Sequence, residues 1–327
     1  LVIPAYAESV SDQVSGFLLP TNVKSALTNE VICALDLGSK NFKFVSGHHV
    51  NGRIQTKLLN KISLNLGNEL NQYDGVIRPN KLSELESVLG TFAKYCHNKG
   101  ISKFLAIATS AVRNMKNNSE IVALARNAGI ELEIADGQRE GEIGYLAATY
   151  GEPNCIVAEL GSHSCQIAWD DGNEIKVDPL NIGYQRIFEQ FFRGPDDFGI
   201  ASNIYRKYLD QHITHLPATA GGFSALAANS VAAIVLDKDK KDVRGTYLKR
   251  SDLQRKLNTF EQLSNTDFEG LKRSLDKASK TLPGMVFLDY IMDRSGHDQV
   301  LISDAELPVG LIVEYFKSKK VPSKVSH

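Results

Sequence analysis

The stretches Asp36-Leu37-Gly38-Ser39 and Glu159-Leu160-Gly161-Ser162 decide the fold of this chain. Both read acid-Leu-Gly-Ser, and they are offset by 123 residues. Each follows an apolar run typical of a strand and precedes a second run of the same kind. An internal repeat at this distance indicates two units with the same plan, so we predict two related α/β lobes.

The repeated turn has the chemistry of an anion-binding site. Its glycine lets the backbone bend sharply and approach a ligand, and successive N–H groups with a serine hydroxyl form an anion-sized nest. Either turn alone is better explained as a plain tight hairpin. The repeat favours two nests, at Gly38-Ser39 and Gly161-Ser162, that hold neighbouring phosphates of one chain across a cleft.

The remaining pattern places strands and helices in a similar order in both halves. In the first half, where Asn51-Gly52 is a hairpin signal, we expect strands at 31–35, 42–45, 53–64, 104–108 and 131–135 and helices at 81–98, 119–128 and 138–150. In the second half we expect strands at 156–158, 165–169, 174–177, 220–222 and 299–302, and helices at 184–192, 195–213 and after 304. This order predicts mixed β-sheets flanked by helices, with a cleft between the lobes.

The domain boundaries follow from the repeat. We expect an N-terminal extension over 1–29, a first lobe over 30–150, and a second lobe over 151–327 whose helical C-terminal part could return its last helix to the first lobe. Ala5-Tyr6-Ala7 reads like the cleavage tripeptide at the end of a secretory signal, although no basic segment precedes it. We therefore favour a periplasmic location, with a cytoplasmic location as the alternative.

Composition excludes several classes of protein. Lys and Arg (37) nearly balance Asp and Glu (38), so no strong field points to nucleic acid or to a membrane surface. No apolar run approaches the roughly 20 residues of a membrane helix. The four cysteines lack zinc-site spacing, and Cys33 and Cys165 lie in strand-like runs, so we interpret them as small buried hydrophobes.

Ordered motifs from about residue 31 to 316 resemble the exopolyphosphatase / guanosine pentaphosphate phosphohydrolase family of the actin-like ATPase superfamily. Residues 34–42 are similar to its first phosphate loop, usually D-L-G-S-N-S-F. Residues 108–113 look like T-x-A-x-R, whose arginine contacts phosphate, and residues 134–140 look like I-x-S-G-x-E-E. Two C-terminal segments, 282–284 and 302–304, also resemble the family. The resemblance implies two actin-like (ribonuclease H-like) lobes.

The second loop departs from the family pattern. The family reads D-I-G-G-G-S-T-E, whereas this chain reads Glu159-Leu160-Gly161-Ser162-His163-Ser164-Cys165-Gln166. Asp becomes Glu, two glycines become Ser and His, and the last acid becomes Gln. Lys40 replaces Asn in the first loop, and the later G-x-S-G-T segment is altered at residues 220–224. These changes put unchanged activity in doubt.

The resemblance assigns a role to each candidate residue. Glu140 would position the attacking water, and Gln166 would help to orient it. Asp36 and Glu159 would share a Mg²⁺ ion through water molecules. Phosphate would be bound by Gly38, Ser39, Lys40, Arg113, Gly161, Ser162 and Ser164. Without the resemblance, Glu140 reads as a helix-dipole partner, and Arg113 and Lys40 read as solvated side chains.

The function that follows is hydrolysis of terminal phosphoanhydride bonds in inorganic polyphosphate or in a nucleotide polyphosphate. The altered second loop favours an alternative, a polyphosphate- or nucleotide-binding sensor that has lost turnover. A sugar kinase-like activity is a third reading, because the superfamily also binds ATP. Family members often dimerise, so a homodimer is expected on that ground alone.

Overall fold

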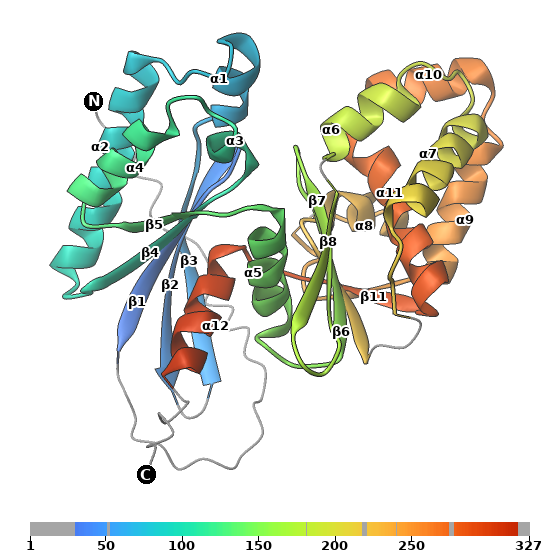
Figure 1. The fold of residues 1–327 in the computed structure, drawn as a ribbon. Helices are drawn as coiled ribbons and strands as arrows, with labels where there is room; N and C mark the ends of the chain where they lie inside the picture. The colour runs from blue at the N-terminus through green and yellow to red at the C-terminus, as the bar shows by residue number, and fades with distance from the viewer. Residues whose placement is uncertain are drawn as a thin grey trace.

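The computed structural model describes residues 30–50, 53–180, 182–217, 221–239, 241–274 and 278–319. The expected extension over 1–29 and the hairpin turn at Asn51-Gly52 lie outside the described residues. Two mixed sheets flanked by helices form the architecture (Figure 1), so the predicted fold class is confirmed.

The first sheet has the strand order β3-β2-β1-β4-β5. β1 pairs antiparallel with β2 and parallel with β4. Its strands are β1 (Val31–Leu37), β2 (Asn41–Val50), β3 (Arg53–Ser63), β4 (Lys103–Ala108) and β5 (Glu131–Ile134). The helices that follow these strands are α1 (Leu66–Gln72), α2 (Pro79–Asn98), α3 (Ser110–Arg113) and α4 (Asn118–Asn127). Alternate residues of β1 enter two different cores, which is why its sequence is apolar throughout.

The second sheet has the strand order β10-β11-β9-β6-β7-β8. Its strands are β6 (Cys155–Leu160), β7 (Cys165–Asp170), β8 (Ile175–Leu180), β9 (Gly222–Leu226), β10 (Tyr247–Lys249) and β11 (Gln299–Ile302). The helices around it are α6 (Tyr184–Ile187), the π-helix η1 (Phe188–Phe192), α7 (Phe198–His212), α8 (Asn229–Leu236), α9 (Arg250–Glu261), α10 (Asn265–Ser274) and α11 (Ala278–Ser295). β6 repeats the neighbours of β1, with an antiparallel hairpin partner on one side and a parallel strand on the other.

Two helices join the sheets. α5 (Gly137–Thr149) packs against β6, β7 and β8, whereas α12 (Pro308–Ser318) comes from the far end of the chain and packs against β1 and β2. The two helices also pack against each other between the sheets (Figure 1). Gly310 permits this approach, because a Cβ there would lie 2.0 Å from the carbonyl oxygen of Ile143.

One interpretation of the cysteines is wrong. Cys33 of β1 does not act only as a small hydrophobe, because it forms a disulfide with Cys96 of α2, and both residues are buried. Sequence spacing could not reveal this pair, since 63 residues separate its members. Cys165 is a free buried thiol, as expected. None of the helices in the described ranges is both long enough and apolar enough to cross a bilayer.

Candidate active site

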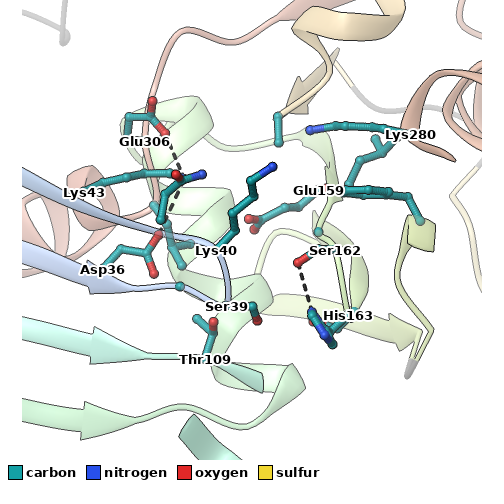
Figure 2. A pocket seen from close by; sticks show the side chains of 18 of the residues that line it. Asp36, Ser39, Lys40, Lys43, Thr109, Glu159, Ser162, His163, Lys280 and Glu306 are labelled. Carbon is teal, nitrogen blue, oxygen red and sulfur yellow. Dashed lines mark hydrogen bonds and ion pairs between the residues drawn. The ribbon is translucent and has the colours of Figure 1, made fainter. Parts of the chain in front are cut away.

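The two repeated turns line one cavity of about 270 Å³ between the sheets. The first turn joins β1 to β2 and the second joins β6 to β7. Figure 2 shows Ser39 and Ser162 entering the cavity from opposite lobes. At each turn, backbone N–H groups at the start of a helix donate to carbonyl groups of the turn. The other polar groups of the turn remain available to a ligand.

The backbone contacts at the two turns match. In the first, the Gly67 N–H of α1 donates to the carbonyl of Ser39 at 2.8 Å. In the second, the Gln185 N–H of α6 donates to the carbonyl of Ser162, the equivalent residue, at 3.4 Å, and the Tyr184 N–H donates to the carbonyl of Gly161 at 3.0 Å. Neither turn has room for a side chain at its glycine, because a Cβ would meet a carbonyl oxygen at 2.8 Å at Gly38 and at 2.2 Å at Gly161.

The structure divides the predicted site residues into two layers. Those that line the cavity are Asp36, Gly38, Ser39, Lys40, Glu140, Glu159, Gly161, Ser162 and Ser164. Arg113 and Gln166 lie behind this lining. Arg113 donates to the carbonyl of Ala135, and its Nη1 is 3.6 Å from Oε2 of Glu140, so here it contacts the candidate base.

Glu140 lies in the first turn of α5 and is only 5% exposed. The N-cap residue Asp136 starts this helix by accepting a hydrogen bond from the Arg139 N–H at 2.8 Å. Burial raises the pKa of Glu140, the nearby Glu159 carboxylate raises it further, and Arg113 partly offsets both. A carboxylate whose pKa lies close to neutrality is suited to accept a proton from water.

A chain of hydrogen bonds reaches Glu140 from the second hairpin. Gln166 Nε2 donates to Ser164 Oγ at 3.0 Å, and Ser164 Oγ donates to Glu140 Oε1 at 3.5 Å. Gln166 is 2% exposed, so it acts on the cavity through Ser164. An uncharged amide fits this position, because it supplies a donor without adding another buried carboxylate.

Two departures in the second loop face each other in the sheet. Glu159 of β6 is the direct cross-strand partner of Gln166 of β7. Burial raises the pKa of Glu159, and Lys43 opposes part of that rise. Both changes from the family pattern, the longer acid at 159 and the missing acid at 166, therefore affect one cross-strand pair. This pair carries one carboxylate instead of two.

The same register in the first hairpin identifies a residue that sequence reasoning missed. Asp36 of β1 faces Lys43 of β2. Residues 36 and 159 are equivalent in the repeat, so Lys43 is the counterpart of Gln166. The 123-residue offset between the two turns could therefore have identified Lys43 from the sequence. Lys43 Nζ lies 3.5 Å from Asp36 Oδ2 and 2.9 Å from Oε2 of Glu306. Dashed lines in Figure 2 mark these two ion pairs.

Lys43 and its two acid partners shift one another's pKa values. Burial alone would lower the pKa of Lys43, but Glu306 and Asp36 outweigh burial and raise it. Burial raises the pKa of Asp36 despite Lys43, whereas Lys43 outweighs burial at Glu306 and lowers the pKa there. Three further basic residues line the cavity, namely Lys61, Arg244 and Lys280.

The Mg²⁺ site predicted at Asp36 and Glu159 has both unpartnered carboxylate oxygens and a lysine beside it. One oxygen of each acid, and one of Glu140, is buried without a hydrogen-bond partner, so each could accept another donor. Among the described residues no group of three or more His, Cys, Asp or Glu is placed to hold a metal ion, so an ion here would depend on two acids and water molecules. The ammonium group of Lys43 lies beside Oδ2 of Asp36, whereas Oδ1 is the oxygen without a partner.

Two mixed sheets that each contribute a matched turn to one cavity define a two-lobed protein of the actin-like class. The chain belongs to the Ppx/GppA phosphatase family, whose model matches residues 45–319. This membership confirms the family resemblance described above.

Individual relatives are distant. The guanosine-5'-triphosphate,3'-diphosphate pyrophosphatase of Vibrio cholerae serotype O1 is 22% identical over 303 residues, which are 89% of this chain and 60% of that protein. This chain thus spans about 60% of the length of that curated relative.

Solved structures give the same fold. The Aquifex aeolicus PPX-GPPA enzyme has a TM-score of 0.75 at 20% identity, over 87% of this chain and 99% of that one. An exopolyphosphatase from Cytophaga hutchinsonii has a TM-score of 0.68 at 16% identity, over 88% and 98%.

Proposed function

We propose that this chain hydrolyses terminal phosphoanhydride bonds and that its substrate is inorganic polyphosphate. One observation carries the proposal: a buried carboxylate, Glu140, lines the same cavity as two helix-pinned Gly-Ser turns. Family membership supports it, as do the relatives named as a pyrophosphatase and as an exopolyphosphatase.

In this mechanism the two turns bind successive phosphates through N–H and hydroxyl groups, and the cavity's basic side chains neutralise their charge. Glu140 orients a water molecule toward the terminal phosphorus and accepts its proton, while Ser164 keeps the carboxylate in place. As the water oxygen bonds to phosphorus, the bond from that phosphorus to the bridging oxygen breaks, and the shortened chain leaves. Phosphoryl transfer depends mainly on positioning and charge neutralisation, so no covalent intermediate is required.

The experiment is a free-phosphate assay on the full chain with linear polyphosphate, both with Mg²⁺ and in chelator. Glu140→Gln should reduce phosphate release about 10²–10⁴-fold, the range of positioned general-base catalysis. Glu142→Gln is the matched control: it changes an acid on the same helix that is hydrogen-bonded to Gln138 and does not line the cavity. Equal rates for Glu140→Gln and wild type would refute the assigned role.

The alternative is a sensor that binds phosphate chains without turnover, and the uncharged Gln166 favours it. Polyphosphate binding with no phosphate release above the Glu140→Gln background would select the sensor. Formation of ADP from ATP together with an acceptor would select a kinase.

We also propose that the protein acts in the periplasm. The Cys33–Cys96 disulfide supports this location, because disulfides persist in oxidising compartments. Guanosine pentaphosphate is a cytosolic nucleotide, so a periplasmic enzyme would act on polyphosphate. The test is thiol labelling of acid-quenched native protein, in which Cys155 and Cys165 should react after denaturation while the other two cysteines react only after reduction. Labelling of all four without reduction would contradict the proposal.

A further inference from the structure

The positive charge beside Asp36 is the side-chain ammonium group of Lys43. Lys43 reaches from β2 to the end of β1, and its side chain is 19% exposed. Its second partner, Glu306, lies between β11 and α12, so the pair joins segments from opposite ends of the chain. In Figure 2 the amine lies between the two carboxylates at the edge of the cavity.

Acids beside a phosphate site normally need a cation. Carboxylates repel phosphate, and Mg²⁺ usually solves this by binding one or two carboxylates together with substrate oxygens. A lysine ammonium is a compact point charge with three donors, so it can neutralise two acids and still face an anion. The other groups facing it are Lys61, its cross-strand neighbour on β3, and the Glu159 carboxylate.

We propose that Lys43 is the resident cation of this site: its ammonium occupies the place beside Asp36 and Glu306 that a divalent ion would otherwise take. The protein by itself therefore holds no metal ion at Asp36, and it binds a phosphate chain with the lysine as counter-charge. Lys43 is a positioning and charge-neutralising residue that pairs with the acids under the phosphate.

The first test uses Mn²⁺ as the probe and needs no substrate. Metal-free wild-type chain, titrated with Mn²⁺ and followed by electron paramagnetic resonance, should show no bound ion at Mn²⁺ concentrations up to about 1 mM. Lys43→Met keeps the length of the side chain but leaves two acids without their cation. This variant should melt at a lower temperature than wild type, bind Mn²⁺ at least about tenfold more tightly, and regain thermal stability when Mn²⁺ is added.

Matched variants make the result specific. Lys61→Met removes a cation from the same cavity without removing an ion pair to Asp36 or Glu306, so it should gain no Mn²⁺ site. In Lys43→Met/Glu306→Gln the Mn²⁺ rescue should disappear. Should Lys43→Met fail to fold, Lys43→Arg, which keeps the charge, must fold and stay free of Mn²⁺. Stoichiometric Mn²⁺ binding by wild type, or a folded Lys43→Met with no Mn²⁺ site, would overturn the proposal.

The second test rests on the proposed function. Wild-type chain in chelator should bind tripolyphosphate in a calorimetric titration, and Lys43→Met should lose at least about tenfold in affinity under the same conditions. Binding by wild type only after Mg²⁺ is added would overturn the lysine proposal. If tripolyphosphate binds under no condition, the proposed function fails, whereas the Mn²⁺ titrations still judge Lys43 on their own.

Discussion

Replacing Gln166 with glutamate would restore the acid of the family's second loop, and the structure predicts that it destabilises this protein. The new carboxylate would be 2% exposed and directly opposite Glu159, about 5 Å away as cross-strand neighbours are. At that distance and an effective dielectric constant near 20, two charges repel by about 3 kcal/mol. The variant should lose about that much free energy of unfolding at pH 8.

The loss must depend on pH. The variant can escape repulsion by keeping residue 166 protonated, which costs about 1.4 kcal/mol per pH unit above the unfolded pKa of about 4.3. At pH 5.5 the charge penalty therefore cannot exceed about 1.6 kcal/mol. It grows as the pH rises, because the unfolded chain then releases a proton that the folded chain retains.

Urea unfolding at pH 5.5 and pH 8 measures both values. Gln166→Leu is the control: it removes the hydrogen bond to Ser164 without adding charge, so its cost of about 1 kcal/mol should be the same at both pH values. If Gln166→Glu costs as much at pH 5.5 as at pH 8, packing rather than charge sets the cost, and the argument that Glu159 and Gln166 form one compensated pair is refuted.

Three further outcomes can be checked. The pKa of Glu140 is raised to about 8, so kcat/KM for polyphosphate should rise from pH 6 to about pH 8.5 as the base ionises; a flat profile would contradict this role. Replacing Cys33 and Cys96 by alanine should cost about 4 kcal/mol in urea unfolding, the entropy of a loop closed over 63 residues, and reductant should not destabilise the variant further. Gly161→Ala places a Cβ 2.2 Å from a backbone oxygen and should weaken tripolyphosphate binding at least about tenfold, whereas Gly90→Ala, with open space around it, should bind normally.

Local patterns predicted the parts of the fold that depend on neighbours in sequence. The acid-Leu-Gly-Ser turns were recognisable because a hairpin and its glycine lie within a few residues, and the structure brings both turns to one cavity. The helix expected at 81–98 is α2, Pro79–Asn98, and the strand expected at 299–302 is β11. The short strand β10, Tyr247–Lys249, was missed because three residues carry no periodicity.

Contacts between distant segments could not be predicted in this way. Glu306 reaches Lys43 only because α12 returns to the first sheet, and no repeated motif contains it. Arg113 fits a phosphate-binding motif, yet its side chain is directed to Ala135 and Glu140 by the packing of β5 against β4. The catalytic and binding roles of these residues remain predictions for the experiments above.

The return of α12 has a consequence for assembly. The chain passes between the sheets twice, once through α5 into β6 and again from β11 into α12. Glu306 belongs to the second crossing, so its ion pair with Lys43 forms only when that crossing is in place. The charge balance at the base of the cavity therefore depends on both ends of the chain.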